Sequence, residues 1–230
     1  MSESPAPEHS PRAHHHLTSS QEDYLKALYH LGGVSARIRT NVLARRLQVS
    51  AASATEMLGR LAVQGLVSHD RYRGAMLTAE GTAVALEMVR HHRLLEVYLV
   101  QKLGYTWDEV HDEAEHLEHA ISERMEARMF EILGRPNVDC HGDPIPSQDG
   151  NVTPSKHRTL LEASARERLR VRRVSDHDAV KLRALSRLGL RLGVEFEVLQ
   201  ESTHEGPIVL RVAGRRRQVP IGLARVVFVE

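Results

Sequence analysis

The chain has 230 residues, of which 41% are hydrophobic and 27% charged, and its formal net charge is +1. This length suits one large domain or two to three small ones, and the composition is that of an ordinary globular protein. No apolar stretch approaches the roughly 18 residues of a membrane-spanning helix, and the N-terminal segment has no apolar core for secretion. We therefore expect a cytoplasmic protein with no membrane partner.

Charged residues are distributed unevenly along the chain. Arginines dominate residues 37–73, where Glu56 and Asp70 are the only acids, whereas residues 108–131 are rich in acids and histidines. Such segregation indicates one part that contacts an anion and another that collects cations.

Residues 1–16 are rich in Ser, Pro, Ala and His without apolar periodicity, so we expect a disordered arm, in which the run His14 to His16 is incidental. A helix is predicted from Ser19 onward because Tyr24, Leu25, Leu28 and Leu31 form one helical stripe.

Residues 17–78 are predicted to form a winged helix-turn-helix domain that binds double-stranded DNA. Two short helices, starting near Thr40 and Ala51, follow the first helix and are separated by a tight turn at Val49 and Ser50. Alternating apolar and polar residues on both sides of residues 71–74 then predict a β-hairpin, which would be the wing.

The second short helix is the candidate recognition helix, and its short side chains favour recognition by DNA shape and phosphate position over direct base reading. The residues expected to contact DNA are Arg39, Ser50, Ala52, Ser53, Thr55, Glu56, Arg60, Arg71 and Arg73.

The rest of the chain divides into three parts. Residues 79–140 are predicted to be helical, with one helix ending at Gly104 and another running from near Thr106 to Gly134. Residues 141–158 contain many Gly and Pro residues and are expected to be a linker. Residues 159–230 contain short β-rich runs and one helical stretch, which predicts a small SH3-like β-barrel in a mainly α protein.

Residues with metal-binding side chains recur at helical spacing in the second part. His111, Glu115, Glu118 and His119 share one helical face, and the preceding helix carries His92 and Glu96 at i, i+4. A solvated charged face is the alternative interpretation. The second pair on a neighbouring helix favours a transition-metal site.

The sequence resembles the diphtheria-toxin-repressor family of metal-dependent regulators, and specifically its manganese-responsive branch. The resemblance rests on SQEDYLKALYHL, LARRLQVSAASATEMLGRLAVQGLV, RHHRLLEVYL, VHDEAEHLEH and HGDPIP. It covers nearly all of residues 17–146 and extends more weakly to the C-terminal, FeoA-like part.

The resemblance implies a homodimeric repressor of metal-ion homeostasis that binds a palindromic operator when Mn²⁺ is bound. It also implies two metal sites per subunit. The primary site would consist of Asp23, Glu115, Glu118 and His119. The ancillary site would consist of His92, Glu96 and His111, completed by Asp178 or Asp176.

Iron-responsive members carry methionine at the position of Asp23 and cysteine at that of Glu115, so the oxygen donors here favour Mn²⁺, with Fe²⁺ as the alternative. Lys26 replaces a glutamate of the short manganese-responsive members, which argues against a second ion adjacent to the first. Cys140 and His141 are interpreted as structural.

Two other functions are compatible with parts of the pattern. A Glu/His metal-dependent hydrolase would need an open coordination position and a separate base, which nothing in the sequence marks, so we expect neither enzyme activity nor a small-molecule substrate. A winged-helix regulator without a metal would leave the histidine and carboxylate stripe unexplained.

Dimerisation is expected through an apolar stripe on residues 110–133, which comprises Leu117, Ile121, Met125, Met129 and Ile132.

Overall fold

The computed structural model describes residues 17–153, 156–175, 178–202 and 206–230. The run His14 to His16 and the candidate ligand Asp176 lie outside these residues. The chain forms two compact units, the first ending at Ala85 and the second comprising Leu86–Glu230.

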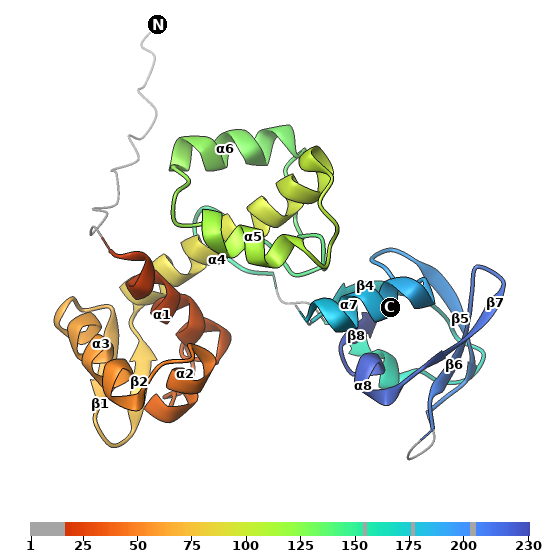
Figure 1. Cartoon of the computed structure of the whole chain (residues 1–230), viewed down its shortest axis with the longest axis horizontal. Coiled ribbons are helices and arrows are strands. Elements are labelled where there is room, and N and C mark those ends of the chain that lie inside the picture. Colours follow the sequence, from red (N-terminus) through yellow and green to blue (C-terminus); the bar gives the residue numbers. More distant parts are fainter. Residues whose placement is uncertain (1–16, 154–155, 176–177, 203–205) are drawn as a thin grey trace, which may run out of the picture. The chain divides into compact units, whose positions relative to one another are not determined.

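The first unit contains three helices and a hairpin, α1 (Ser19–His30), α2 (Thr40–Arg46), α3 (Ala51–Val63), β1 (Val67–Asp70) and β2 (Gly74–Leu77), followed by the start of α4 (Ala79–Leu103) (Figure 1). The inward faces of the helices and of the hairpin share one core, which includes Leu25, Leu28, Leu43, Leu58 and Leu61. The helix-turn-helix and wing predicted from the sequence are both present.

Side-chain caps fix where two of these helices begin. The Thr18 hydroxyl accepts from the Gln21 amide while the Gln21 side chain accepts from the Thr18 amide, which forms a capping box before α1. Ser50 caps α3 by accepting from the Ser53 amide at 3.0 Å. The turn between α2 and α3 is therefore set by local sequence.

The wing is held against the segment before α2. Asp70 Oδ1 accepts from the amides of Tyr72 and Arg73, which closes the hairpin turn. Arg37 donates to the carbonyls of Ser68 and Gly74 from outside the hairpin. Gly74 has φ +96°, and a Cβ there would lie 2.1 Å from the Ile38 carbonyl oxygen, so this close approach requires glycine.

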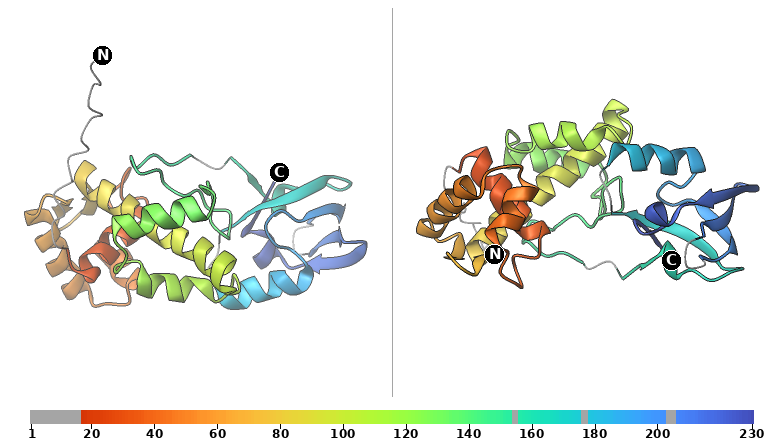
Figure 2. Two further views of the ribbon diagram at one scale, coloured as in Figure 1. Left: turned by 90° about the horizontal axis from the view of Figure 1, so that it is seen from above. Right: turned by 60° about the horizontal axis from the view of Figure 1, so that its bottom comes forward.

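The second unit begins with a helical part in which α4, α5 (Val110–Leu117) and α6 (Glu123–Ile132) lie side by side (Figures 1 and 2). Leu94, Leu95, Val110, Ala114 and Met129 form its core. In the described residues, no helix combines the length and apolarity needed to cross a membrane.

One helix was expected from near Thr106 to Gly134, and this prediction was wrong. The chain leaves the helix after Leu117, and a new helix starts at Glu123 because the Ser122 hydroxyl accepts from the Met125 amide. The break divides the expected apolar stripe between two helices. Met125 and Ile132 on α6 are exposed, whereas Met129 is buried.

The C-terminal part is a six-stranded antiparallel sheet in the order β3-β8-β4-β5-β6-β7. Its strands are β3 (Arg158–Thr159), β4 (Arg168–Val174), β5 (Glu195–Gln200), β6 (Ile208–Val212), β7 (Arg215–Val219) and β8 (Val227–Val229), accompanied by η1 (Leu160–Glu162), α7 (Ala179–Leu188) and α8 (Ile221–Ala224).

The small SH3-like β-barrel expected for this part does not close over the residues that the structure describes. Among the described residues the edge strands β3 and β7 do not pair with each other, so the sheet stays open. Strand β7 and helix α8 were also not predicted. The arginine run at the start of β7 has little apolar alternation, which explains why the strand escaped the pattern analysis.

The sheet packs closely against the helical part of the same unit. The Trp107 side chain belongs to the core of the sheet, and its Nε1 donates to Ser186 Oγ at 2.8 Å. The Val174 amide donates to the His141 carbonyl at 2.8 Å, and Arg173 pairs with Asp143 at 3.0 Å. These contacts place the segment around His141 between α4 and the sheet.

Candidate metal centre and DNA-binding surface

His92 and Glu96, one helical turn apart on α4, are buried at the centre of a cluster of metal-binding side chains. His92 Nε2 lies 3.1 Å from Glu96 Oε1 and 3.0 Å from His111 Nδ1. His92 Nδ1 lies 2.6 Å from Glu118 Oε2 and 3.9 Å from Glu115 Oε1. The structure thus brings the α4 pair together with the donors of α5.

Two groups of donors can be separated within this cluster. One consists of His92, His111 and Glu115, whose ligand atoms lie within 4.8 Å of one another. The other consists of Glu96, Cys140 and His141, whose ligand atoms also lie within 4.8 Å of one another. Each therefore has three side chains close enough to bind one ion.

The second group includes two residues that the sequence analysis interpreted as structural. His141 Nδ1 lies 3.7 Å from Glu96 Oε2, and Cys140 Sγ lies 3.5 Å from His141 Nδ1. Cys140 and His141 lie in a loop with Gly and Pro residues, which has no helical or strand periodicity from which side-chain positions could be predicted. Glu96 was expected as a ligand from its helical spacing, whereas Cys140 and His141 were marked in the sequence by their adjacency and by the motif HGDPIP, which begins at His141.

The Glu96 carboxylate is fully buried and has three histidines around it. Burial alone would raise its pKa, but the interactions with His111, His141 and His92 hold the pKa of Glu96 well below its ordinary value. The same carboxylate and Cys140 raise the pKa of His141 to about 11 against the opposing effect of burial. Burial raises the pKa of the Cys140 thiol to about 11.

The donor chemistry fits a divalent transition metal. Glu96 Oε2 is buried and has no hydrogen-bond partner among the residues that the structure describes, since His141 is beyond hydrogen-bond distance. A buried carboxylate oxygen surrounded by imidazole nitrogens is the environment that a coordinated cation satisfies. His92, Glu96, His111, Glu115, Cys140 and His141 are the residues that would hold such ions.

The residues predicted to contact DNA lie on the first unit. All five predicted residues at the start of α3 are exposed, namely Ser50, Ala52, Ser53, Thr55 and Glu56. Several of their polar atoms already have local partners: Ser50 Oγ lies 2.8 Å from Ser53 Oγ, and Thr55 donates to the Ala51 carbonyl. This supports recognition by shape and phosphate position rather than by direct base contacts.

The four predicted arginines, Arg39, Arg60, Arg71 and Arg73, are also exposed. Arg60 forms an i, i+4 ion pair with Glu56 at 2.5 Å. Arg71 and Arg73 lie in the wing turn, on either side of the strongly exposed Tyr72. A basic wing beside an exposed helix is suited to contact a phosphate backbone.

Three family models match consecutive parts of the chain. Residues 16–75 match the iron dependent repressor N-terminal DNA binding domain, residues 78–147 match the iron dependent repressor metal binding and dimerisation domain, and residues 158–230 match the FeoA domain. The chain is 31% identical to the diphtheria toxin repressor of Corynebacterium efficiens, over 93% of this chain and 96% of that protein. The chain belongs to the diphtheria-toxin-repressor family.

Other members of the family match over a similar length. The iron-dependent repressor IdeR of Mycobacterium leprae is 30% identical, over 93% of this chain and 98% of that protein. A solved structure of a manganese-dependent transcriptional repressor in complex with manganese has 41% identity and a TM-score of 0.80, over 91% of this chain and 98% of that one. The structure of the manganese regulator SloR has 32% identity and a TM-score of 0.71, over 93% of this chain and 99% of that one.

Membership of the diphtheria-toxin-repressor family decides between the functions left open by the sequence. The protein is a metal-dependent, DNA-binding transcriptional repressor with a dimerisation domain, and it is not a hydrolase. The resemblance stated from sequence motifs is confirmed.

The remaining predicted ligands of this repressor are placed as follows. Asp23 lies on α1 in the first unit, where Lys26 is buried one turn further along. Glu118 and His119 follow α5 in the second unit, with Glu118 buried and His119 Nε2 3.7 Å from Glu118 Oε1. Asp178 caps α7 by accepting from the Val180 amide and belongs to neither donor group of the second unit among the described residues.

Proposed function

We propose that this repressor is activated by Mn²⁺ to bind a palindromic operator as a homodimer and thereby controls metal-ion homeostasis. The observation that carries the choice of metal is the carboxylate of Glu115 beside His92 and His111. Oxygen and imidazole donors suit Mn²⁺, which binds weakly to most sites and is selected by ligand hardness and geometry.

Fe²⁺ is the second candidate. Two observations favour it: the curated relatives include proteins named iron-dependent repressors, and Cys140 adds a sulfur donor beside Glu96 and His141. Sulfur is softer than oxygen and shifts preference away from Mn²⁺. The choice therefore depends on which donor group controls DNA binding.

We assign two ions to each subunit. One set is Asp23, Glu115, Glu118 and His119, of which Glu115 also lies 3.9 Å from His92 and from His111 of the other set. The other is built around His92, Glu96 and His111, with Cys140 and His141 added to the sequence assignment because of their distances to Glu96. The carboxylate expected from the C-terminal part would be Asp178 or Asp176.

The mechanism follows from the two units on which the ligands lie. Asp23 belongs to the DNA-binding unit, whereas Glu115, Glu118 and His119 belong to the other. These four residues would hold one divalent ion, whose positive charge would keep the four donors together and so favour the DNA-competent arrangement of the units. To shift the ratio of the DNA-competent to the incompetent arrangement from 1:99 to 99:1, the ion must bind the competent arrangement more tightly by about 5.5 kcal/mol.

The deciding experiment selects binding sequences from a random duplex library with metal-free protein to which Mn²⁺ is added. We expect an enriched inverted repeat that is bound only with the metal and released by a chelator. His119→Ala should abolish binding, whereas His116→Ala, which changes an exposed histidine of α5, should not. Enrichment that does not depend on metal would contradict the proposal, and anaerobic activation by Fe²⁺ at lower concentration than Mn²⁺ would favour iron.

A further inference from the structure

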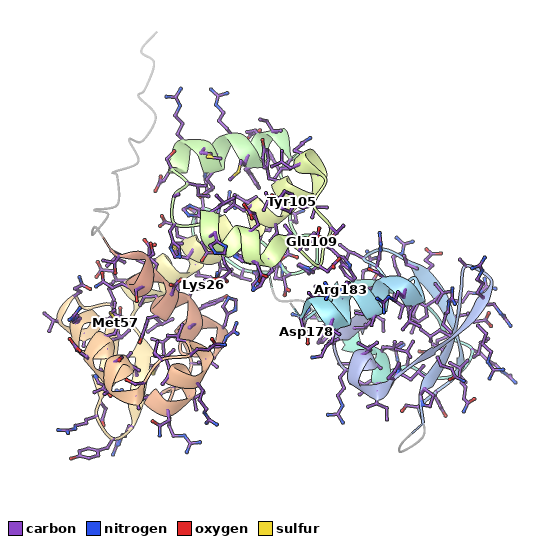
Figure 3. The ribbon with its side chains drawn as sticks, in the orientation of Figure 1. Lys26, Met57, Tyr105, Glu109, Asp178 and Arg183 are labelled. Carbon is purple, nitrogen blue, oxygen red and sulfur yellow. The ribbon has the colours of Figure 1, made fainter. Side chains whose placement is uncertain are left out.

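A cleft of about 490 Å³ lies in the second unit between the segment joining α4 to α5 and helix α7 with the turn that follows it. Figure 3 labels Tyr105 on the first of these walls and Arg183 on the second. Clefts of this size between packed parts of a protein are where small ligands are generally bound. None of the metal-site or DNA-contact residues assigned above lines it except Cys140.

The charge in the cleft is strongly positive. Arg183, Arg187 and Arg191 line the α7 side at intervals of four residues, and Asp108 is the only acidic residue in the lining. Asp108 forms an ion pair with Arg183, whose Nη1 lies 3.3 Å from Asp108 Oδ2. Arg187 and Arg191 are exposed and have no hydrogen-bond or ion-pair partner in the part of the chain that the structure describes.

The floor of the cleft is apolar. Val100, Tyr105 and Leu192 contribute partly buried side chains, and Trp107 is largely buried beside them. Arginines that only face solvent do not line a cleft together with apolar side chains of this kind. The combination of two unpaired guanidinium groups with an apolar floor is the environment for a ligand that carries both an anionic group and an apolar body.

We propose that this cleft binds a small organic anion, whose phosphate or carboxylate group is held by Arg187 and Arg191 and whose apolar body lies against Val100, Tyr105 and Leu192. Both walls would contact the ligand, so its binding stabilises the packing of the helical part on the sheet.

The ligand would also contact the residue that supports the metal centre. Trp107 lies in the cleft wall, its carbonyl accepts from His141 Nε2 at 2.8 Å, and its ring stacks on the His141 ring with centroids 5.8 Å apart. Occupancy of the cleft is therefore coupled to the position of His141, and the anion serves as a second effector beside the metal.

Trp107 is the single tryptophan of the chain, so its fluorescence reports on the cleft directly. Metal-free full-length protein is titrated with hexyl phosphate and, separately, with heptanoate. We expect a saturable fluorescence change with at least one of them, and the stronger one identifies the anionic group. Inorganic phosphate and 1-hexanol, which each lack one half of the ligand, should bind at least tenfold more weakly.

The variant Arg187→Gln with Arg191→Gln should lower the affinity for the stronger probe at least tenfold. The matched control is Arg215→Gln with Arg216→Gln, which removes the same charge from exposed positions on β7 outside the cleft. The control should change affinity less than twofold, and circular dichroism should show both variants folded. Absence of saturation with both probes, equal binding of 1-hexanol, or equal loss in the two double variants would each overturn the proposal.

Discussion

Oε2 of the fully buried Glu96 carboxylate lies 3.7 Å from Nδ1 of the equally buried His141. The two residues come from helix α4 and from the loop after α6, so no local pattern relates them. Because Glu96 also contacts His92 and His111, it is the one carboxylate of the described cluster with imidazoles from three segments around it.

His141→Ala should weaken binding of one of the two metal ions about 10- to 100-fold, since it removes a donor beside a buried carboxylate. Isothermal titration of metal-free protein with Mn²⁺ measures this. His116→Ala is the matched control, because it changes an exposed histidine and should leave both affinities unchanged. Unaltered stoichiometry and affinity in His141→Ala would remove this residue from the metal site.

Asp23→Met together with Glu115→Cys should lower the response to Mn²⁺ relative to Fe²⁺ and Co²⁺, because sulfur replaces oxygen at both positions. The measurement is DNA affinity across titrations of the three ions, with Fe²⁺ handled anaerobically. Glu118→Ala should instead abolish activation by every ion. An unchanged order of metal preference in the double variant would locate selectivity in the group that contains Cys140.

Glu126→Ala should lower the free energy of unfolding by about 3 to 5 kcal/mol, because it leaves the buried Arg90 guanidinium without its carboxylate partner. Arg90 Nε lies 2.7 Å from Glu126 Oε1, and both side chains are less than one tenth exposed. Glu56→Ala is the control, since its ion pair with Arg60 is about two-thirds exposed and should contribute less than about 0.5 kcal/mol. Urea unfolding measures the free energy of unfolding of both variants. Equal losses in the two variants would contradict the larger contribution of the buried pair.

The Glu126 pair also makes stability depend on pH. Burial would raise the pKa of Glu126, but His91 and Arg90 hold it below the ordinary value of 4.5. A lowered folded-state pKa means that this stabilisation is fully present above about pH 4.5 and is lost as the pH falls through the folded-state pKa. Glu126→Gln should therefore flatten the stability curve on its acid side, and an unchanged acid limb would count against this assignment.

Gly74→Ala should destabilise the first unit by more than about 1 kcal/mol, because φ is positive and the added Cβ would meet the Ile38 carbonyl. Gly59→Ala should have the opposite sign and stabilise by about 0.5 to 1 kcal/mol, since α3 has open space there. Thermal unfolding of the two variants provides the comparison. A Gly74→Ala variant as stable as the parent protein would show that the wing does not need this glycine.

Arg71→Gln should weaken binding of the metal-activated protein to duplex DNA about equally for all sequences. If Arg71 contacts a phosphate, the slope of log affinity against log salt should fall by about 0.9. Arg166→Gln is the control, because it removes the same charge from an exposed position near the sheet. A slope that is unchanged by Arg71→Gln would exclude a phosphate contact from this side of the wing.

The sequence by itself determined the features that depend on helical and strand periodicity. Tyr24, Leu25 and Leu28 share one face of a helix because 3.6 residues complete a turn, and His92 and Glu96 share another for the same reason. The short turn before the Ser50 cap and the alternation around residues 71–74 likewise placed the helix-turn-helix and the wing. These are local consequences of backbone geometry.

Tertiary structure decided the features that depend on contacts between segments distant in the sequence. The loop carrying Cys140 and His141 returns to α4 because the Val174 amide and Arg173 hold it against the sheet. Glu118 at the end of α5 lies 2.6 Å from His92 of α4, a contact between two helices that periodicity along one helix does not determine. The sheet stays open because β3 and β7 are not paired, and pairing between distant strands is set by packing that a single sequence does not encode locally.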